Sequence, residues 1–174
     1  MTDMPEMGGM PSNDELVPFF TFEDIDHALE NGEFCCYLQP KCNAETGTIV
    51  GAEALVRWNH PKYGVIPPGW FVPVLERAGR ICHVDVFVWR FVAEMLGRWE
   101  REGRNLVPVS VNVSMMDINQ MDVADVIGGL LNEYNIDARL LQVEITESAV
   151  AKNLPRGEGY HPQTACERHR GTDG

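Results

Sequence analysis

Glu53, Asn112 and Glu144 are oxygen-bearing residues that each stand among alternating aliphatic residues in this 174-residue sequence. Side chains of a β-strand point alternately to its two faces, so each residue is expected on the face opposite the aliphatic side chains. Two carboxylates and one amide oxygen are hard ligands, which suit Mg²⁺ or Mn²⁺ better than Zn²⁺. The pattern therefore predicts one divalent-cation site that these three residues share.

A structural explanation competes with that prediction. A glutamate near a strand end can be a solvated rim residue, and buried polar groups can bond to one another. Both faces of a helix-covered parallel sheet are expected to be apolar, so three polar residues on successive strands favour a site. Arg57 shares the predicted face of Glu53, and two roles stay open for it: contact with a phosphate, or a salt bridge with an acid such as Glu53.

The hydrophobic pattern predicts strands that alternate with helices from residue 21 onward. Strands are predicted at 34–38, 48–58, 106–114 and 140–147, and helices at 22–30, 68–78, 84–99 and 123–134. This alternation is typical of parallel βαβ units and of an α/β fold. Sites on barrels of such units lie at the carboxyl ends of the strands, where this interpretation places Glu53, Asn112 and Glu144.

The charge of the chain limits its partners. With 26 acidic and 14 basic residues the formal net charge is -12, which argues against nucleic acid and anionic membranes as partners.

We find no apolar run of transmembrane length and no signal peptide at the start, so a cytoplasmic location is expected. Five cysteines, an odd number, fit a reducing compartment. A metal site of Cys35, Cys36 and Cys42 is disfavoured, because adjacent strand residues point to opposite faces.

Three segments differ in composition. Residues 1–20 are rich in Met, Pro and Gly and are predicted to form a flexible tail. Residues 21–153 carry the periodic pattern of one domain. Residues 154–174 have few aliphatic residues and no period, so we predict a disordered or foreign tail, such as a frameshift would leave, or an ordinary flexible C-terminus.

An ordered series of motifs resembles a known family. The motifs are YLQPK (37–41), GAEALVRW (51–58), NHPKYGVIPPGWFVPVLERAG (59–79), VSVNVS (109–114) and VEITES (143–148). Together they resemble the EAL family of bacterial cyclic-di-GMP phosphodiesterases. Members hydrolyse cyclic-di-GMP to linear pGpG in second-messenger signalling, on a modified TIM-like (β/α) barrel. The resemblance therefore implies this fold and this substrate for residues 21–153.

The resemblance also implies roles for single residues. It implies a Mg²⁺ or Mn²⁺ site whose ligands are Glu53, Asn112 and Glu144. It implies contact with the dinucleotide by Gln39, Leu55 and Arg57. It implies that Glu147 braces an active-site loop.

Later parts of the family pattern have no counterpart in this sequence. The family continues with an Asp-Asp-Phe-Gly stretch, a lysine, and a further Glu and Gln, and no Asp-Asp pair occurs in the 174 residues. We therefore expect only the N-terminal half of the barrel, about four strands, with little or no hydrolysis by this chain alone. A non-catalytic cyclic-di-GMP-binding or protein-interaction module is the alternative, and a non-functional gene remnant a third. A half barrel has two unpaired edges, which association into a homodimer would cover.

Overall fold

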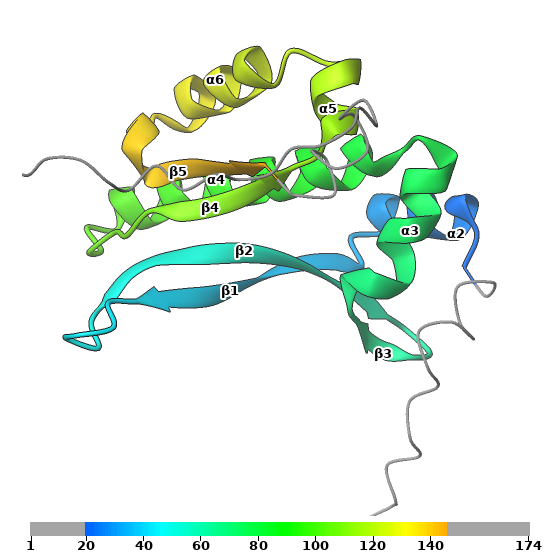
Figure 1. Cartoon of the computed structure of the whole chain (residues 1–174), viewed down its shortest axis with the longest axis horizontal. Coiled ribbons are helices and arrows are strands. Elements are labelled where there is room, and N and C mark those ends of the chain that lie inside the picture. The colour runs from blue at the N-terminus through cyan, green and yellow to red at the C-terminus, as the bar shows by residue number, and fades with distance from the viewer. Residues whose placement is uncertain (1–19, 146–174) are drawn as a thin grey trace, which may run out of the picture.

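One mixed sheet with helices packed against one of its faces makes up the fold. The computed structural model describes residues 20–145 (Figure 1). The strands are β1 (Phe34–Cys42), β2 (Ile49–His60), β3 (Gly64–Ile66), β4 (Val109–Val113) and β5 (Leu141–Ile145). Their order across the sheet is β1-β2-β4-β5, and the short β3 pairs with β2. This is the predicted α/β class, with about the predicted number of long strands.

The first two strands are antiparallel, so the prediction of βαβ units throughout the chain was wrong at this point. β1 pairs with β2 from Phe34 opposite Trp58 to Cys42 opposite Ile49. Only residues 43–48 join the two strands, whereas a parallel connection needs a dozen or more residues. The pairs β2 with β4 and β4 with β5 are parallel, as predicted.

Of the α-helices within residues 20–145, four were predicted from the sequence and one was not. The predicted helices are α2 (Phe22–Glu30), α3 (Pro68–Ala78), α4 (Ile81–Arg101) and α6 (Val123–Tyr134). The short helix α5 (Met115–Gln120), the 3₁₀ turn η1 (Ala138–Leu140) and β3 were not predicted, because each is too short to show a period. Both α2 and α5 begin with a capping box, in which Thr21 pairs with Asp24 and Ser114 with Asp117.

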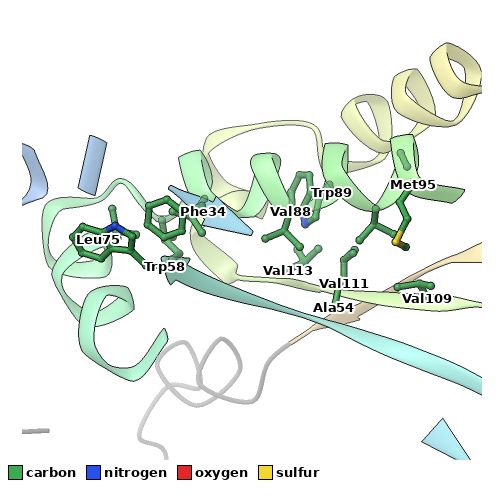
Figure 2. Packing of buried hydrophobic residues seen from close by; sticks show 14 of the residues in the cluster. Phe34, Ala54, Trp58, Leu75, Val88, Trp89, Met95, Val109, Val111 and Val113 are labelled. Carbon is green, nitrogen blue, oxygen red and sulfur yellow. The ribbon is translucent and has the colours of Figure 1, made fainter. Parts of the chain in front are cut away.

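The hydrophobic core lies between the sheet and the helices. Figure 2 shows Val88, Trp89 and Met95 of α4 above the valines of β4, with Leu75 of α3 near Phe34 and Trp58. The buried side chains that the sheet sends to this face include Phe34, Ala52, Ala54, Trp58, Val109, Val111, Val113 and Leu141. The polar residues of the same strands therefore lie on the opposite face, as the alternation predicted.

The ends of the chain are largely outside the described residues. The predicted tail at 154–174 lies outside them entirely, and so does the predicted N-terminal tail up to residue 19. Phe20 is buried, with its ring 4.7 Å from that of Trp58 between centroids. No helix within residues 20–145 is both long and apolar enough to cross a membrane.

Candidate functional site

The polar face of the sheet carries nearly all of the predicted site residues. β1 contributes Gln39, β2 contributes Glu53, Leu55 and Arg57, β4 contributes Asn112, and β5 contributes Glu144. Glu147 lies outside the described residues. Strand alternation and register thus assemble on one surface residues that are up to 105 positions apart, since 144 − 39 = 105.

Glu53 and Asn112 are in direct contact. The Nδ2 of Asn112 donates a hydrogen bond to Oε1 of Glu53 at 3.1 Å. The backbone of Asn112 is fixed from the other side, because Nε1 of Trp89 donates to its carbonyl oxygen at 3.0 Å. Both side chains are half-buried. The contact uses Nδ2 of Asn112 and Oε1 of Glu53, and it does not engage Oδ1 of Asn112 or Oε2 of Glu53.

Glu144 is the register partner of Asn112 on the adjacent parallel strand. Its carboxylate forms an ion pair with Nζ of Lys41, and that ammonium also donates to Oγ of Ser110 at 2.8 Å. The hydrogen bond from Lys41 holds the pKa of Glu144 below its usual value, and Ser110 adds to the effect. Two of the three predicted ligands therefore touch, while the third lies at the neighbouring register position, paired with a lysine.

Lys41 is the residue of this surface that the sequence reasoning missed. It belongs to the YLQPK stretch and shares the face of Gln39 by alternation, so its side of the strand was readable. The sequence did not indicate that this side chain reaches across the sheet from β1 to β5. Gly51 lies opposite Lys41 on β2 and has no side chain to block that path.

The position of Glu53 along its strand corrects one prediction. Glu53 is the fifth residue of the twelve-residue β2 and does not lie at its carboxyl end. Only Ala52 and Glu53 of β2 pair with β4, and the strand then leaves the parallel sheet to pair with β3. Asn112 and Glu144 do lie near the carboxyl ends of β4 and β5.

Lys41, Glu53, Asn112 and Glu144 form one polar cluster. The residues predicted to contact a dinucleotide lie beside this cluster on the β1–β2 hairpin. Gln39 is exposed and lies opposite Glu53 in the register, and Leu55 lies opposite Tyr37. The guanidinium of Arg57 donates to the carbonyl of Val56 at 2.8 Å and lies 5.6 Å from the centroid of the Tyr37 ring. Arg57 takes part in none of the ion pairs found within residues 20–145, so the salt bridge with Glu53 is not formed there.

A cavity of about 200 Å³ adjoins the cluster. It lies between β2, β4, α3 and α4, and both Leu55 and Asn112 line it. Asp85 of α4 also lines it, and burial raises the pKa of this carboxyl to about 9, with Asp117 adding to the shift. The cluster therefore has an open polar side and a partly apolar hollow beside it.

Of the cysteines within residues 20–145, Cys35 lies on the polar face of the sheet, opposite Arg57 in the β1–β2 register. Cys35 and Cys36 point to opposite faces of β1, and burial raises the pKa of the Cys36 thiol to about 12. Cys82 is on α4. Within residues 20–145 no three His, Cys, Asp or Glu side chains converge as a metal site would require.

Comparison with known proteins identifies the family. The family model described as EAL domain matches residues 23–161, which is more than half of the chain. The chain belongs to the EAL domain family. The match confirms the family that the motif series predicted.

Two relatives from Pseudomonas aeruginosa illustrate the similarity. Cyclic di-GMP phosphodiesterase RocR is 32% identical over 143 residues, which is 81% of this chain and 36% of RocR. The bifunctional diguanylate cyclase/cyclic di-GMP phosphodiesterase MucR is 30% identical over 130 residues, 75% of this chain and 19% of MucR. The chain thus spans about a third or less of the length of these curated relatives.

Solved structures support the fold. The PaMucR phosphodiesterase in complex with c-di-GMP has a TM-score of 0.69 and 30% identity, over 75% of this chain and 53% of that chain. The FimX EAL domain of Xanthomonas citri, also in complex with c-diGMP, has a TM-score of 0.67 at 20% identity over 80% of this chain and 53% of that chain, and supports the fold alone. The predicted partial TIM-like barrel of the EAL type is confirmed.

Proposed function

We propose that this chain forms the cation-binding and dinucleotide-binding part of a cyclic-di-GMP phosphodiesterase. The observation that carries the proposal is the 3.1 Å contact between Asn112 and Glu53 beside the register position of Glu144. Three oxygen-bearing residues from three strands lie there as neighbours, Glu53 and Asn112 in contact and Glu144 at the next register position, on the face of the sheet that no helix within residues 20–145 covers. The family match and the named activities of RocR and MucR support the choice of substrate.

Glu53, Asn112 and Glu144 are proposed to hold Mg²⁺ or Mn²⁺. Their carboxylate and amide oxygens have the hardness that these cations prefer, and none of the three is a sulfur or imidazole ligand. A cation bound there would neutralise phosphate charge and act as a Lewis acid. Lys41 shares the Glu144 carboxylate, so this ammonium sets how freely Glu144 can turn toward a cation.

Gln39, Leu55 and Arg57 are proposed to contact the dinucleotide. Arg57 provides a local positive charge on a chain of net charge -12, and a guanidinium can donate two parallel hydrogen bonds to a phosphate. Leu55 offers apolar surface at the mouth of the cavity, against which a base can pack. The exposed amide of Gln39 lies next to Glu53, within the same patch.

Calorimetric titration of the purified 174-residue chain with cyclic-di-GMP, with and without Mg²⁺, tests the proposal. Binding is expected to depend on the cation. Glu53→Gln removes one charged ligand and Arg57→Ala removes the phosphate donor, and each is expected to weaken binding about 10- to 100-fold, the equivalent of one charge-assisted hydrogen bond. Glu94→Gln is the matched control, because Glu94 is an exposed carboxylate on α4, away from the polar face.

Three outcomes separate the explanations. Cation-dependent binding that Glu94→Gln leaves intact supports the proposal. Binding that ignores both the cation and Glu53→Gln would favour a non-catalytic binding module. No binding by a sample with a folded circular dichroism spectrum contradicts the proposal.

The cytoplasmic location and the homodimer stay predictions, and sedimentation velocity with and without ligand tests the homodimer.

A further inference from the structure

Asp117 on α5 is a carboxylate with no exposed surface, at 0%. Its Oδ2 accepts hydrogen bonds from the backbone N of Ser114 at 2.7 Å and from Oγ of Ser114 at 2.6 Å, which closes the capping box of α5. Its Oδ1 is buried and accepts no hydrogen bond from the residues of the described range. A buried carboxylate oxygen without a donor costs free energy, so a donor for this atom has to be sought among the groups around it.

Asp85 on α4 supplies such a donor if its carboxyl is protonated. Asp85 lines the same cavity as Ser114, the residue whose cap Asp117 closes, and after burial Asp117 is the neighbour that most raises the pKa of Asp85. The titratable groups that face Asp85 are Asp117 from α5 and Glu76 from α3, and Cys82 of the same helix also faces Asp117. Burial and these negative neighbours all raise the pKa of Asp85, to about 9, and no cationic side chain within residues 20–145 is among the causes of the shift. Two carboxyl groups in such a place share one proton.

Helix α4 also holds the segment around Asn112 at two further points. Nε1 of Trp89 donates to the carbonyl oxygen of Asn112 at 3.0 Å. At the far end of α5, Sγ of Cys82 donates to Oε1 of Gln120 at 2.8 Å. The contact with Asp117 lies between these two, at the capping box that begins two residues after Asn112. The end of β4 and both ends of α5 thus lie against the first half of α4.

We propose that a protonated Asp85 donates a hydrogen bond to Oδ1 of Asp117, and that this bond fixes the β4–α5 junction against α4. Asp85 and Asp117 are then positioning residues for Asn112. They act through the Ser114 cap and touch no ligand themselves. The inference stands on the fully buried Asp117, on its unpaired Oδ1 and on the half-buried Asp85 in the cavity beside the Ser114 cap, and it holds whether or not the chain binds cyclic-di-GMP.

The indole N–H of Trp89 is a direct reporter, because it bonds to the backbone of Asn112. In ¹H–¹⁵N spectra of the full chain from pH 5 to pH 10, with Trp89→Phe to assign the signal, we expect this resonance to shift with a midpoint well above pH 7. Asp85→Asn keeps the shape of the carboxyl and donates at every pH, so its Trp89 signal is expected to stay constant. Asp125→Asn, on the exposed first turn of α6, is the matched control and should titrate like the parent chain.

Unfolding by urea as a function of pH gives a second measurement. The folded-state pKa of Asp85 is raised above its unfolded value near 4, so its contribution to stability is complete below pH 4 and is lost as pH rises through about 9. Between these two pKa values the folded chain keeps the Asp85 proton and the unfolded chain has lost it. Each rise of one pH unit therefore lowers the folding equilibrium constant by up to about tenfold. This contribution to the pH dependence of the free energy of unfolding is expected to vanish in Asp85→Asn and to remain in Asp125→Asn.

Two results would overturn the inference. One is a Trp89 signal in the parent chain that does not move between pH 5 and pH 10, a test that needs no variant of Asp85. The other is an Asp85→Asn chain whose unfolding depends on pH as steeply as that of the parent. Neither measurement involves cyclic-di-GMP or a metal, so a failure here is distinguishable from a failure of the proposed function.

Discussion

The two faces of this sheet differ in what they contribute to the protein. On the helix-covered face Trp58, Val111 and Val113 have at most 1% of their surface exposed. On the open face the Lys41 and Glu144 side chains are 39% and 43% exposed, and they meet in hydrogen bonds and an ion pair. The same strands supply both sets, because alternate residues point to opposite sides. Burial on one face stabilises the fold, and within residues 20–145 the other face keeps polar side chains partly exposed.

The separation between the faces has exceptions, among them Ser110 on the open face and Val143 and Ile145 on the covered side of β5. Ser110 belongs to the open face but is 1% exposed, because it lies between Lys41 and the carbonyl of Ala52. Val143 points to the covered side of β5 and is 45% exposed. The contrast between the faces is therefore strongest at β2 and β4, and substitutions at those strands and at the helix above them test it best.

The largest expected effect is the loss of a core side chain above the covered face. Leu96 of α4 is fully buried, and Leu96→Ala is expected to lower the free energy of unfolding by about 2–5 kcal/mol, through lost burial and the cavity left behind. Leu55→Ala is the matched control on the open face. Leu55 is half-buried, so the same change should cost clearly less, about 1 kcal/mol. Urea unfolding at pH 7 measures both.

Equal losses for the two leucines would contradict the division between a stabilising face and an available face. If Leu55→Ala leaves stability nearly intact but weakens binding of cyclic-di-GMP, the division becomes sharper. Circular dichroism in the absence of urea should be unchanged for Leu55→Ala.

The next effect concerns the helix layer itself. Gly97 of α4 packs against α6 so closely that a Cβ atom would lie 2.7 Å from the backbone oxygen of Tyr134. Gly97→Ala is therefore expected to destabilise the fold by about 1–3 kcal/mol, since the two helices must move apart. Gly128→Ala, in α6, meets nothing within 4 Å and should stabilise by about 0.5–1 kcal/mol. A Gly97→Ala chain as stable as the parent in thermal unfolding would show that this contact is loose.

The covered face was also the part of the fold that the sequence predicted best. Long apolar periods, such as that of Val84 to Trp99, reveal a buried helix because many residues repeat the same signal. The direction of β1 was misjudged although the predicted strands at 34–38 and 48–58 left only residues 39–47 between them. A link that short between two strands already indicates a hairpin, because a parallel crossover needs more residues. The capping pair Ser114 and Asp117 was likewise a readable start signal for α5.

The open face was predicted residue by residue, but its contacts were not. Alternation placed Glu53 and Asn112 on one side, and the register brings them within 3.1 Å. The pairing of Lys41 with Glu144 joins positions 103 residues apart through a long flexible side chain. The contact between Asp85 and Asp117 depends on how α4 crosses α5. Such contacts follow from tertiary packing, which no local period encodes.

The smallest expected effect belongs to that ion pair. Lys41→Met keeps much of the length of the side chain and removes the ammonium. Lys41 lowers the folded-state pKa of Glu144. The contribution of this ion pair to stability is therefore present above the unfolded-state pKa of Glu144 and is lost as pH falls through the folded-state pKa. Lys41→Met should therefore lower stability at pH 7 by at most about 1 kcal/mol, since both side chains are well exposed to solvent. The difference in the free energy of unfolding between Lys41→Met and the parent chain should vanish at acidic pH.

The same substitution relates the two faces to function. Without the ammonium, Glu144 has lost its competing partner, so titration with Mn²⁺ should show tighter binding by Lys41→Met at pH 7 if the proposed site is correct. Arg139→Met is the matched control, because it removes a solvent-exposed cation whose partner is Asp137 and lies away from the cluster. A stability loss of several kcal/mol in Lys41→Met would place this pair among the determinants of the fold, and the open face would then no longer be separable from the core that supports it.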